Sequence, residues 1–257
     1  MLPSVSDLLS KTIAVYRKNT AYFLRFMAIF FVIIFLLGLA QDAIFSSSLI
    51  PIPGLAFIVY LVSAIMIGIA TLWLNLGLMV ASKHALDEQP LLPFKTVMQQ
   101  VWPFVPAAAI AAVLSGILVL VGGLLFVIPG LMFAVWFSFA SHEVVFFNAA
   151  AIPALQESKR LVVGRWFAVA WRLFAPSFIL AFIASILEVL VLAPFSWPHL
   201  LDIPYNLPAL ITNSLVIAIL YSIIFPMITM ASVMLFFALK KESTPSTPEP
   251  VNPETTA

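Results

Sequence analysis

The sequence contains no cysteine, which excludes disulfide bonds, thiolate zinc sites and a cysteine nucleophile. Charged residues are also scarce. They make up 9% of the 257 residues, whereas about a quarter is usual in soluble domains. Because the net charge is only +1 and no basic run occurs, we expect no nucleic-acid partner. Hydrophobic residues fill 63% of the chain, so lipid rather than water is expected to face much of it.

Catalytic motifs are a further absence. The three histidines, His84, His142 and His199, stand apart and form no H-E-x-x-H zinc motif. Neither a phosphate-binding glycine loop nor the dinucleotide-binding glycine pattern occurs. No serine lies in the G-x-S-x-G pattern of hydrolases. We therefore expect no enzyme activity, no metal and no cofactor.

Long apolar runs dominate what is present. A bilayer core of about 30 Å needs about 20 apolar residues in helix, and this length predicts six spans. A membrane barrel would instead alternate apolar and polar residues, but runs such as 29–37 are continuous. The prediction is an all-α, polytopic membrane bundle with spans near residues 22–40, 54–82, 104–128, 131–147, 167–193 and 207–239.

Two boundaries in the predicted layout are the join between the third and fourth spans and the end of the membrane domain. The third and fourth spans meet at Pro129-Gly130 and could form one broken helix, but about 40 apolar residues are too many for one crossing. Residues 1–241 are predicted to form a single membrane domain. Residues 242–257 are rich in proline and threonine and have almost nothing to bury, which predicts a disordered cytoplasmic tail.

The basic residues set the orientation. All twelve lysines and arginines lie before the first span, after the sixth, or on the connections and span ends of the same side. The opposite connections, near 41–53, 122–130 and 194–208, have none. The positive-inside rule then predicts that both termini are cytoplasmic. The expected location is the cell membrane, which the chain would cross several times. A cleaved signal peptide over the first span fits poorly, because Leu39-Ala40-Gln41 does not match the small-residue cleavage pattern.

Three amphipathic stretches, 3–16, 93–102 and 153–166, lie on this basic side, and each enters a pair of spans. In the first, Val5, Leu9, Ile13 and Tyr16 recur at helical spacing, and Ser4 with Asp7 predicts a capping box. Proline suits the first helical position, which we assign to Pro93 and Pro153. The predicted partners are the lipid bilayer and its anionic headgroups, contacted by Lys11, Arg17, Lys18, Lys95, Lys159 and Arg160.

These stretches divide the chain into three units, each an interfacial helix followed by a helical hairpin. Trp102 and Trp166 end two of the stretches, at a depth that suits tryptophan. The alternative is that any junction between a loop and a span carries basic and aromatic residues. A true repeat would matter because repeats often place a binding site on their shared axis.

Polar residues inside the spans are the candidate site. Arg25, Asn75, Glu143 and Arg172 are each expected about 6–11 Å below the cytoplasmic interface. We predict that Glu143 is ionised and pairs with Arg172, Arg25 or both, with Asn75 nearby. The alternative is that the arginines extend separately to the interface and Glu143 is protonated against a carbonyl. Glu188 lies near the outer end of the fifth span, where no basic residue faces it.

The segment 128–174 resembles a known family. A Pro-Gly turn opens a span, and an Ala-Leu-x-x-Ser-x-x-Leu helix and a Gly-x-Trp step follow. This order is similar to the membrane domain found with glycerophosphoryl diester phosphodiesterases. The resemblance implies a multi-span fold, but not hydrolysis, which in that family belongs to a separate soluble barrel. The matching positions are Pro129, Gly130, Ala154, Leu155, Ser158, Leu161, Gly164 and Trp166.

These observations predict a non-enzymatic membrane protein that acts as a scaffold, an assembly factor or a lipid-interacting module. The alternative is a small-molecule or lipid transporter, which the inner polar residues, Glu188 and a proline within the sixth span, Pro226, would favour. The sequence identifies neither a protein partner nor an oligomeric state.

Overall fold

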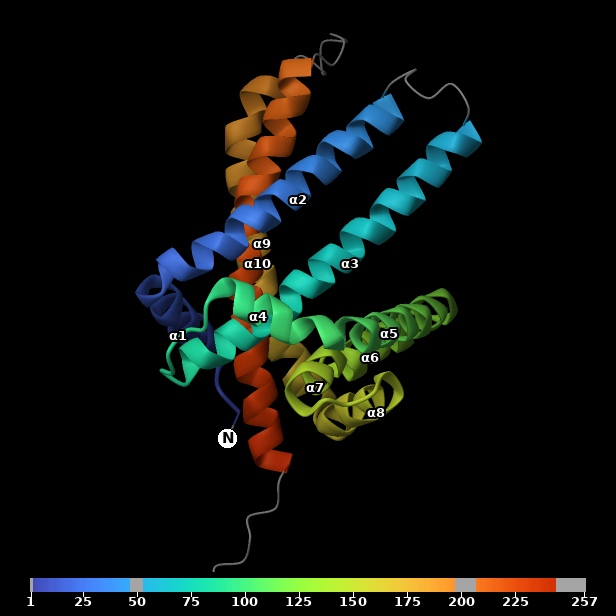
Figure 1. The fold of residues 1–257 in the computed structure, drawn as a ribbon. Coiled ribbons are helices and arrows are strands. Elements are labelled where there is room, and N and C mark those ends of the chain that lie inside the picture. Colours follow the sequence, from blue (N-terminus) through green and yellow to red (C-terminus); the bar gives the residue numbers. More distant parts are fainter. Residues whose placement is uncertain (1, 47–52, 197–206, 244–257) are drawn as a thin grey trace, which may run out of the picture.

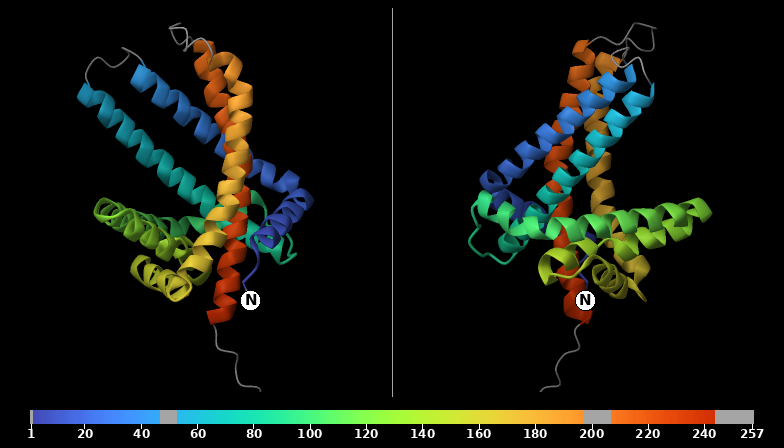
Figure 2. Two further views of the ribbon diagram at one scale, coloured as in Figure 1. Left: turned by 180° about the vertical axis from the view of Figure 1, so that it is seen from behind. Right: turned by 45° about the vertical axis from the view of Figure 1, so that its right-hand side comes forward.

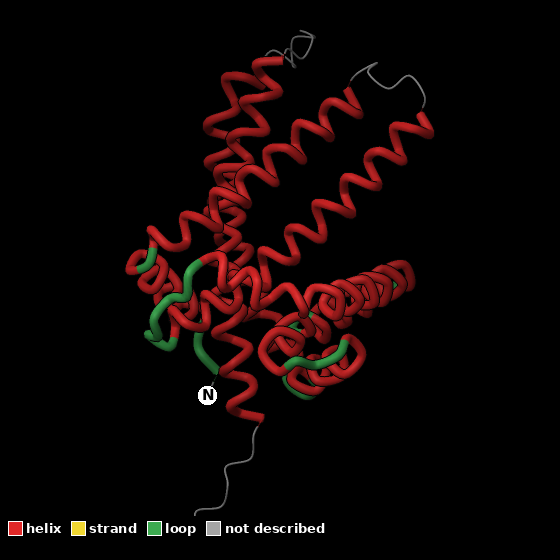
Figure 3. Tube along the Cα trace, in the orientation of Figure 1, coloured by secondary structure: helices red, strands yellow, loops and turns green. Residues whose placement is uncertain are grey.

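The computed structural model describes residues 2–46, 53–196 and 207–243 (Figure 1). All regular elements in these ranges are helices (Figure 3), so the all-α prediction is confirmed. Six segments are long and apolar enough to cross a membrane, as a multi-pass membrane protein requires. They are Thr20–Leu39, Phe57–Leu86, Phe94–Leu125, Val127–Phe147, Trp166–Val191 and Ser214–Ser243.

The element order follows the predicted units. The first unit has α1 (Val5–Lys18) and the hairpin of α2 (Thr20–Ser46) and α3 (Pro53–Leu86). The second has α4 (Phe94–Val101), the short 3₁₀ helix η1 (Trp102–Phe104), α5 (Val105–Leu125), α6 (Val127–Phe137) and α7 (Ala140–Phe147). The third has α8 (Ala151–Val162), α9 (Trp166–Ser196) and α10 (Leu207–Ser243).

Contacts between the units close in a ring. The second helix of each hairpin contacts the first helix of the next one: α3 contacts α5, α6 contacts α9, and α10 contacts α2. The amphipathic helices follow the same rule, since α4 packs on α3, α8 packs on α6 and α7, and α1 packs on α10 and α9. The three units are therefore arranged cyclically.

One end of the molecule, here called the base, is formed by α1, α4, α7 and α8 together with the adjoining ends of the long helices. From it α2, α3, α9 and α10 rise; α9 and α10 stay side by side, and the upper ends of α2 and α3 lean away from them (Figures 1 and 2). The buried aromatic core also lies toward the base, where Phe23 and Phe26 of α2 and Phe139 and Phe236 are fully buried. The outer halves of the long helices expose their apolar side chains, as helices surrounded by lipid do.

The α5–α6 hairpin leaves the base at a steep angle to α10 in every view (Figure 2). Its apolar tip, residues 124–128, is between 66% and 78% exposed. A tip of this composition is suited to lipid rather than to water. Neither the angle of this hairpin nor the exposure of its tip follows from the spacing of the spans.

Several boundaries differ from the prediction. The chain breaks at Phe126, which is extended, and Pro129-Gly130 instead lies in the first turns of α6. A side chain at Gly130 would have its Cβ 2.8 Å from the Cα of Gly123, so the two helices meet through small residues. Helix α10 continues through Ser243, two residues into the predicted tail, and residues 244–257 lie outside the described ranges.

Candidate functional site

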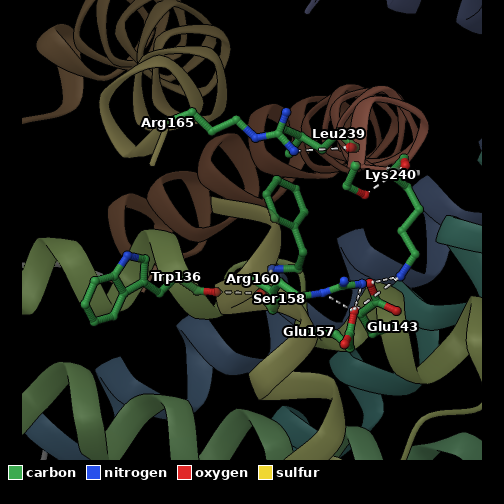
Figure 4. A network of polar contacts seen from close by, with 10 residues as sticks. Trp136, Glu143, Glu157, Ser158, Arg160, Arg165, Leu239 and Lys240 are labelled. Carbon is green, nitrogen blue, oxygen red and sulfur yellow. Dashed lines mark hydrogen bonds and ion pairs between the residues drawn. The ribbon is translucent and has the colours of Figure 1, made fainter. Parts of the chain in front are cut away.

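A charged cluster joins three helices at the base, and we call it the base latch: Glu143 of α7, Glu157 and Arg160 of α8, and Lys240 of α10 (Figure 4). Glu143 is only 1% exposed, and its Oε1 lies 2.7 Å from the Lys240 Nζ. The same ammonium lies 3.9 Å from Glu157, which accepts two hydrogen bonds from Arg160 at 3.0 and 2.7 Å. Two acids thus meet two bases, and the latch has no net charge.

The predicted pairing of Glu143 with an arginine is wrong. Arg172 donates from Nε to the Pro3 carbonyl at 2.8 Å and from Nη1 to the Ala168 carbonyl at 2.9 Å. Arg25 is exposed on α2 and forms no ion pair within the described ranges, as a side chain that extends to the interface would. The partner is Lys240, which lies just beyond the predicted sixth span and was counted only as an orientation signal.

Asn75 does not join Glu143 either. Its Oδ1 accepts a hydrogen bond from the Thr229 hydroxyl of α10 at 3.1 Å. Thr229 lies eleven residues before Lys240, about 16 Å along the helix axis. Glu188 is partly buried on α9 and has no hydrogen bond or ion pair within the described part of the chain. The four residues of the predicted inner cluster therefore lie in four separate places.

A second contact fixes the end of α10. Arg165 donates to the Glu242 carboxylate at 2.8 Å and to the Leu239 carbonyl at 3.3 Å. Arg165 follows Gly164, whose φ of +85° is a conformation that glycine adopts without strain. The Gly-x-Trp step is thus a turn that directs the chain from α8 into α9.

Ser158 has a role that the sequence did not reveal. The chain breaks between α6 and α7, where backbone groups lose their helical partners. The Ser158 hydroxyl donates to the Trp136 carbonyl at 2.6 Å and accepts from the Phe139 amide at 3.1 Å. The inward face of the Ala-Leu-x-x-Ser-x-x-Leu helix therefore replaces hydrogen bonds that lipid could not supply.

The capping box of α1 is present. The Asp7 amide donates to the Ser4 hydroxyl at 3.1 Å, and the Asp7 carboxylate accepts from the Ser4 amide at 3.1 Å. Hydrogen bonds from the Ser4 hydroxyl and amide hold the pKa of the Asp7 carboxyl below its ordinary value. The face that packs on the bundle is Leu8, Thr12 and Tyr16. In contrast, Ile13 of the predicted apolar stripe remains 42% exposed.

The predicted proline positions need correction. Pro93 is the N-cap of α4, and Pro153 is the third residue of α8 rather than the first. Neither position needs a backbone amide hydrogen bond, so proline is tolerated at both.

The basic residues of the amphipathic helices fall into two groups. Lys11, Arg17 and Lys95 are exposed, and their side chains form no hydrogen bond or ion pair within the described residues. The others contact protein: Lys18 lies 3.9 Å from Glu88, Lys159 lies 4.7 Å from the Trp136 ring, and Arg160 belongs to the base latch.

Grooves and cavities lie between the helices. One groove, of about 480 Å³, lies between α2, α3 and α4. A second, of about 520 Å³, lies between α3, α5 and α10 and contains Asn75. At the base, a cavity of about 420 Å³ between α1, α3 and α10 is lined by Asp7, Lys11, Lys83 and Asp87. Volumes of this size suit small molecules or parts of lipids.

Within the described ranges, no group of three or more histidine, cysteine, aspartate or glutamate side chains is placed to hold a metal ion. No family model, curated protein or solved structure matches the chain.

Proposed function

We propose that the chain is a non-enzymatic, lipid-interacting scaffold of the cell membrane, with its base and both termini in the cytoplasm. Eleven of the twelve lysines and arginines belong to the base helices or to the adjoining ends of the long ones, and the twelfth, Arg165, lies in the turn between α8 and α9. This one-sided distribution supports the orientation through the positive-inside rule. The exposed Lys11 and Arg17 of α1 are then placed to contact anionic headgroups.

The observation that carries this proposal is the contrast between the closed base and the open outer part. The base latch and the Arg165–Glu242 contact hold α7, α8, α9 and α10 together. Above them the α2–α3 pair leans away from the α9–α10 pair (Figure 1). Apolar grooves of about 480 and 520 Å³ lie between α2, α3 and α4 and between α3, α5 and α10. A fixed base beneath grooves of this kind supports lipid binding more directly than it supports catalysis.

The resemblance noted in segment 128–174 fits the same proposal. We infer that the chain is a relative of the membrane domain found with glycerophosphoryl diester phosphodiesterases. In that case Ser158 and Gly164 belong to the shared pattern because they shape the α6–α7 break and the α8–α9 turn.

Native mass spectrometry of the purified chain tests the proposal. After release from nanodiscs of mixed anionic and zwitterionic phospholipids in the gas phase, the protein should retain bound phospholipid. Complete loss of lipid under conditions that keep the protein folded would reject a lipid-interacting role.

Transport is the alternative, and it needs a different measurement. Proteoliposomes containing the pure chain should accumulate no solute against a gradient if the chain is a scaffold. Accumulation of any amino acid, sugar, ion or fluorescent lipid above that of protein-free vesicles would favour the transporter hypothesis instead.

A further inference from the structure

We propose that the groove between α2, α3 and α4 binds one anionic phospholipid, with an acyl chain along the groove and the headgroup phosphate at Lys95. This inference rests on the proposed lipid-interacting function and assigns it a site. The walls are apolar: Ile29 and Ile33 come from α2, Ala70 and Trp73 from α3, and Phe94 and Met98 from α4. The groove has a volume of about 480 Å³.

Hydrogen bonds and ring contacts hold the walls in place. The Trp73 indole donates to the Met98 carbonyl at 2.9 Å, and its ring packs edge-on against Trp102 with centroids 5.1 Å apart. The Tyr22 hydroxyl donates to the Leu92 carbonyl at 2.9 Å. These contacts fix α4 on α2 and α3, so the groove is already formed before a lipid binds. Binding would therefore cost less conformational entropy than if the groove had to be ordered at the same time.

The mouth of the groove is polar on one side only. Lys95 and Gln99 are four residues apart on α4, so they share a face of that helix, and both line the groove. Lys95 is exposed and has no ion pair or hydrogen bond in the described ranges. The acids of the α3–α4 connection have other partners, since Asp87 pairs with Lys83 and Glu88 lies 3.9 Å from Lys18. The positive charge at the mouth is therefore uncompensated.

The unpaired charge of Lys95 distinguishes this groove from the other two hollows described above. The cavity at the base contains two lysines and two aspartates, so its lining is balanced. The groove between α3, α5 and α10 is lined by no charged residue. Of these three hollows among the described residues, the groove beneath Lys95 is the one that combines apolar walls, which suit an acyl chain, with an unpaired cation at its mouth. An anionic headgroup fits that combination better than a zwitterionic one does.

The test compares retention of phosphatidylglycerol and phosphatidylcholine by the full-length chain in native mass spectrometry. The native protein should retain phosphatidylglycerol preferentially. Lys95→Gln should lower the retained phosphatidylglycerol about fivefold, the factor that corresponds to about 1 kcal/mol for one lysine near the surface. Lys241→Gln is the matched control, because Lys241 is also an exposed lysine at the base but lies outside the groove. Equal losses in the two variants would overturn the role of Lys95.

A second pair of variants tests the apolar part. Ala70→Phe places a ring in the groove and should lower retention of both lipid classes at this site, while Val62→Phe, on the lipid-exposed face of the same helix, should not. Ala70→Leu serves the same purpose if the larger residue prevents folding. Unchanged lipid retention in the groove-filling variants would overturn the site while leaving lipid binding elsewhere intact. If the native chain retained no phospholipid at all, the proposed function itself would fail.

Discussion

At the scale of single residues, the buried Glu143 of α7 holds the end of α10 through its ion pair with Lys240. A carboxylate that is 1% exposed loses most of its hydration, and only close, well-placed partners offset that loss. Lys240 provides one at 2.7 Å while its own side chain stays 22% exposed. Since such a pair adds little net stability relative to an apolar pair, its main effect is to fix the position of α10 against α7.

Glu143→Gln should therefore be clearly destabilising. Removing the Glu143 carboxylate takes away the 2.7 Å partner of the Lys240 ammonium and leaves it Glu157 at 3.9 Å. Because Lys240 is 22% exposed and keeps this second acid, the expected decrease in the free energy of unfolding is about 1.5–3 kcal/mol, the usual contribution of a hydrogen bond to a charged group. Lys240→Gln in the same background should add less than it does alone, because the ion pair is already broken. Reversible unfolding in mild detergent or bicelles measures the full double-mutant cycle.

Lys241→Gln is the control for that cycle, since Lys241 is exposed next to Lys240. It should change the free energy of unfolding by no more than about 0.5 kcal/mol, as surface substitutions usually do. Strict additivity of Glu143→Gln and Lys240→Gln would contradict the pairing.

At the scale of elements, breaks and ends of helices carry the constraints. The α6–α7 break frees the Trp136 carbonyl and the Phe139 amide, and Ser158 from α8 pairs with both. Ser158→Ala should lower the free energy of unfolding by about 1–3 kcal/mol, the usual effect of leaving a buried polar group unsatisfied. Reversible unfolding in bicelles measures this change in the free energy of unfolding.

Ser177 is the matched control for Ser158. Its hydroxyl donates only to the Leu173 carbonyl of its own helix. Ser177→Ala should therefore be close to neutral, and an equal effect of the two substitutions would exclude a special role for Ser158.

The start of α1 predicts a pH dependence. Its capping box requires the ionised Asp7 carboxylate, whose pKa lies below the ordinary value because Ser4 donates to it. A carboxyl with a lowered pKa in the folded state stabilises the fold above its unfolded pKa of about 3.9, and this contribution disappears as the pH falls through the lowered value. Carbon-13 titration of Asp7 in neutral micelles should give the lowered pKa, and Ser4→Ala should raise it. A pKa unaffected by Ser4→Ala would contradict the capping interaction.

At the scale of the whole molecule, three similar units pack in a ring. The second helix of each hairpin contacts the first helix of the next, and each amphipathic helix packs on the hairpin before its own unit. The ring brings α10 beside both α2 and α3, so the last helix closes the arrangement. Such closure explains why the longest-range ion pair of the base latch joins residues 97 positions apart.

The topology gives a direct prediction, because the chain has no native cysteine. Single cysteines at Ser47 and Asp202 should react with an impermeant thiol reagent added outside intact cells, whereas those at Ser10, Gln89 and Ser246 should not. Ser47, Asp202 and Ser246 lie outside the described ranges, so labelling supplies the information there. Labelling of the Ser246 position from outside would contradict an even number of crossings.

Much of this architecture was accessible from the sequence by itself. The six apolar segments, the three amphipathic helices that precede them and the Ser4–Asp7 capping box were all predicted, and the described residues contain each of them. These features depend on the order of residues over one or a few helical turns, where spacing alone determines which side chains share a face. Short-range patterns are for this reason visible before any tertiary structure is known.

Only the tertiary structure decided which distant groups meet. The depth of Glu143 was predicted, but its partner depends on the rotation of α10 and on where the last turns of α10 pass α7. The partner is Lys240, whereas Arg172 binds the Pro3 carbonyl. Ser158 reaches the α6–α7 break only because α8 folds back against it. The steep angle of the α5–α6 hairpin likewise depends on packing between units. Hydropathy specifies how long a helix is and what surrounds it, whereas its rotation and neighbours are set by side-chain packing across the whole bundle.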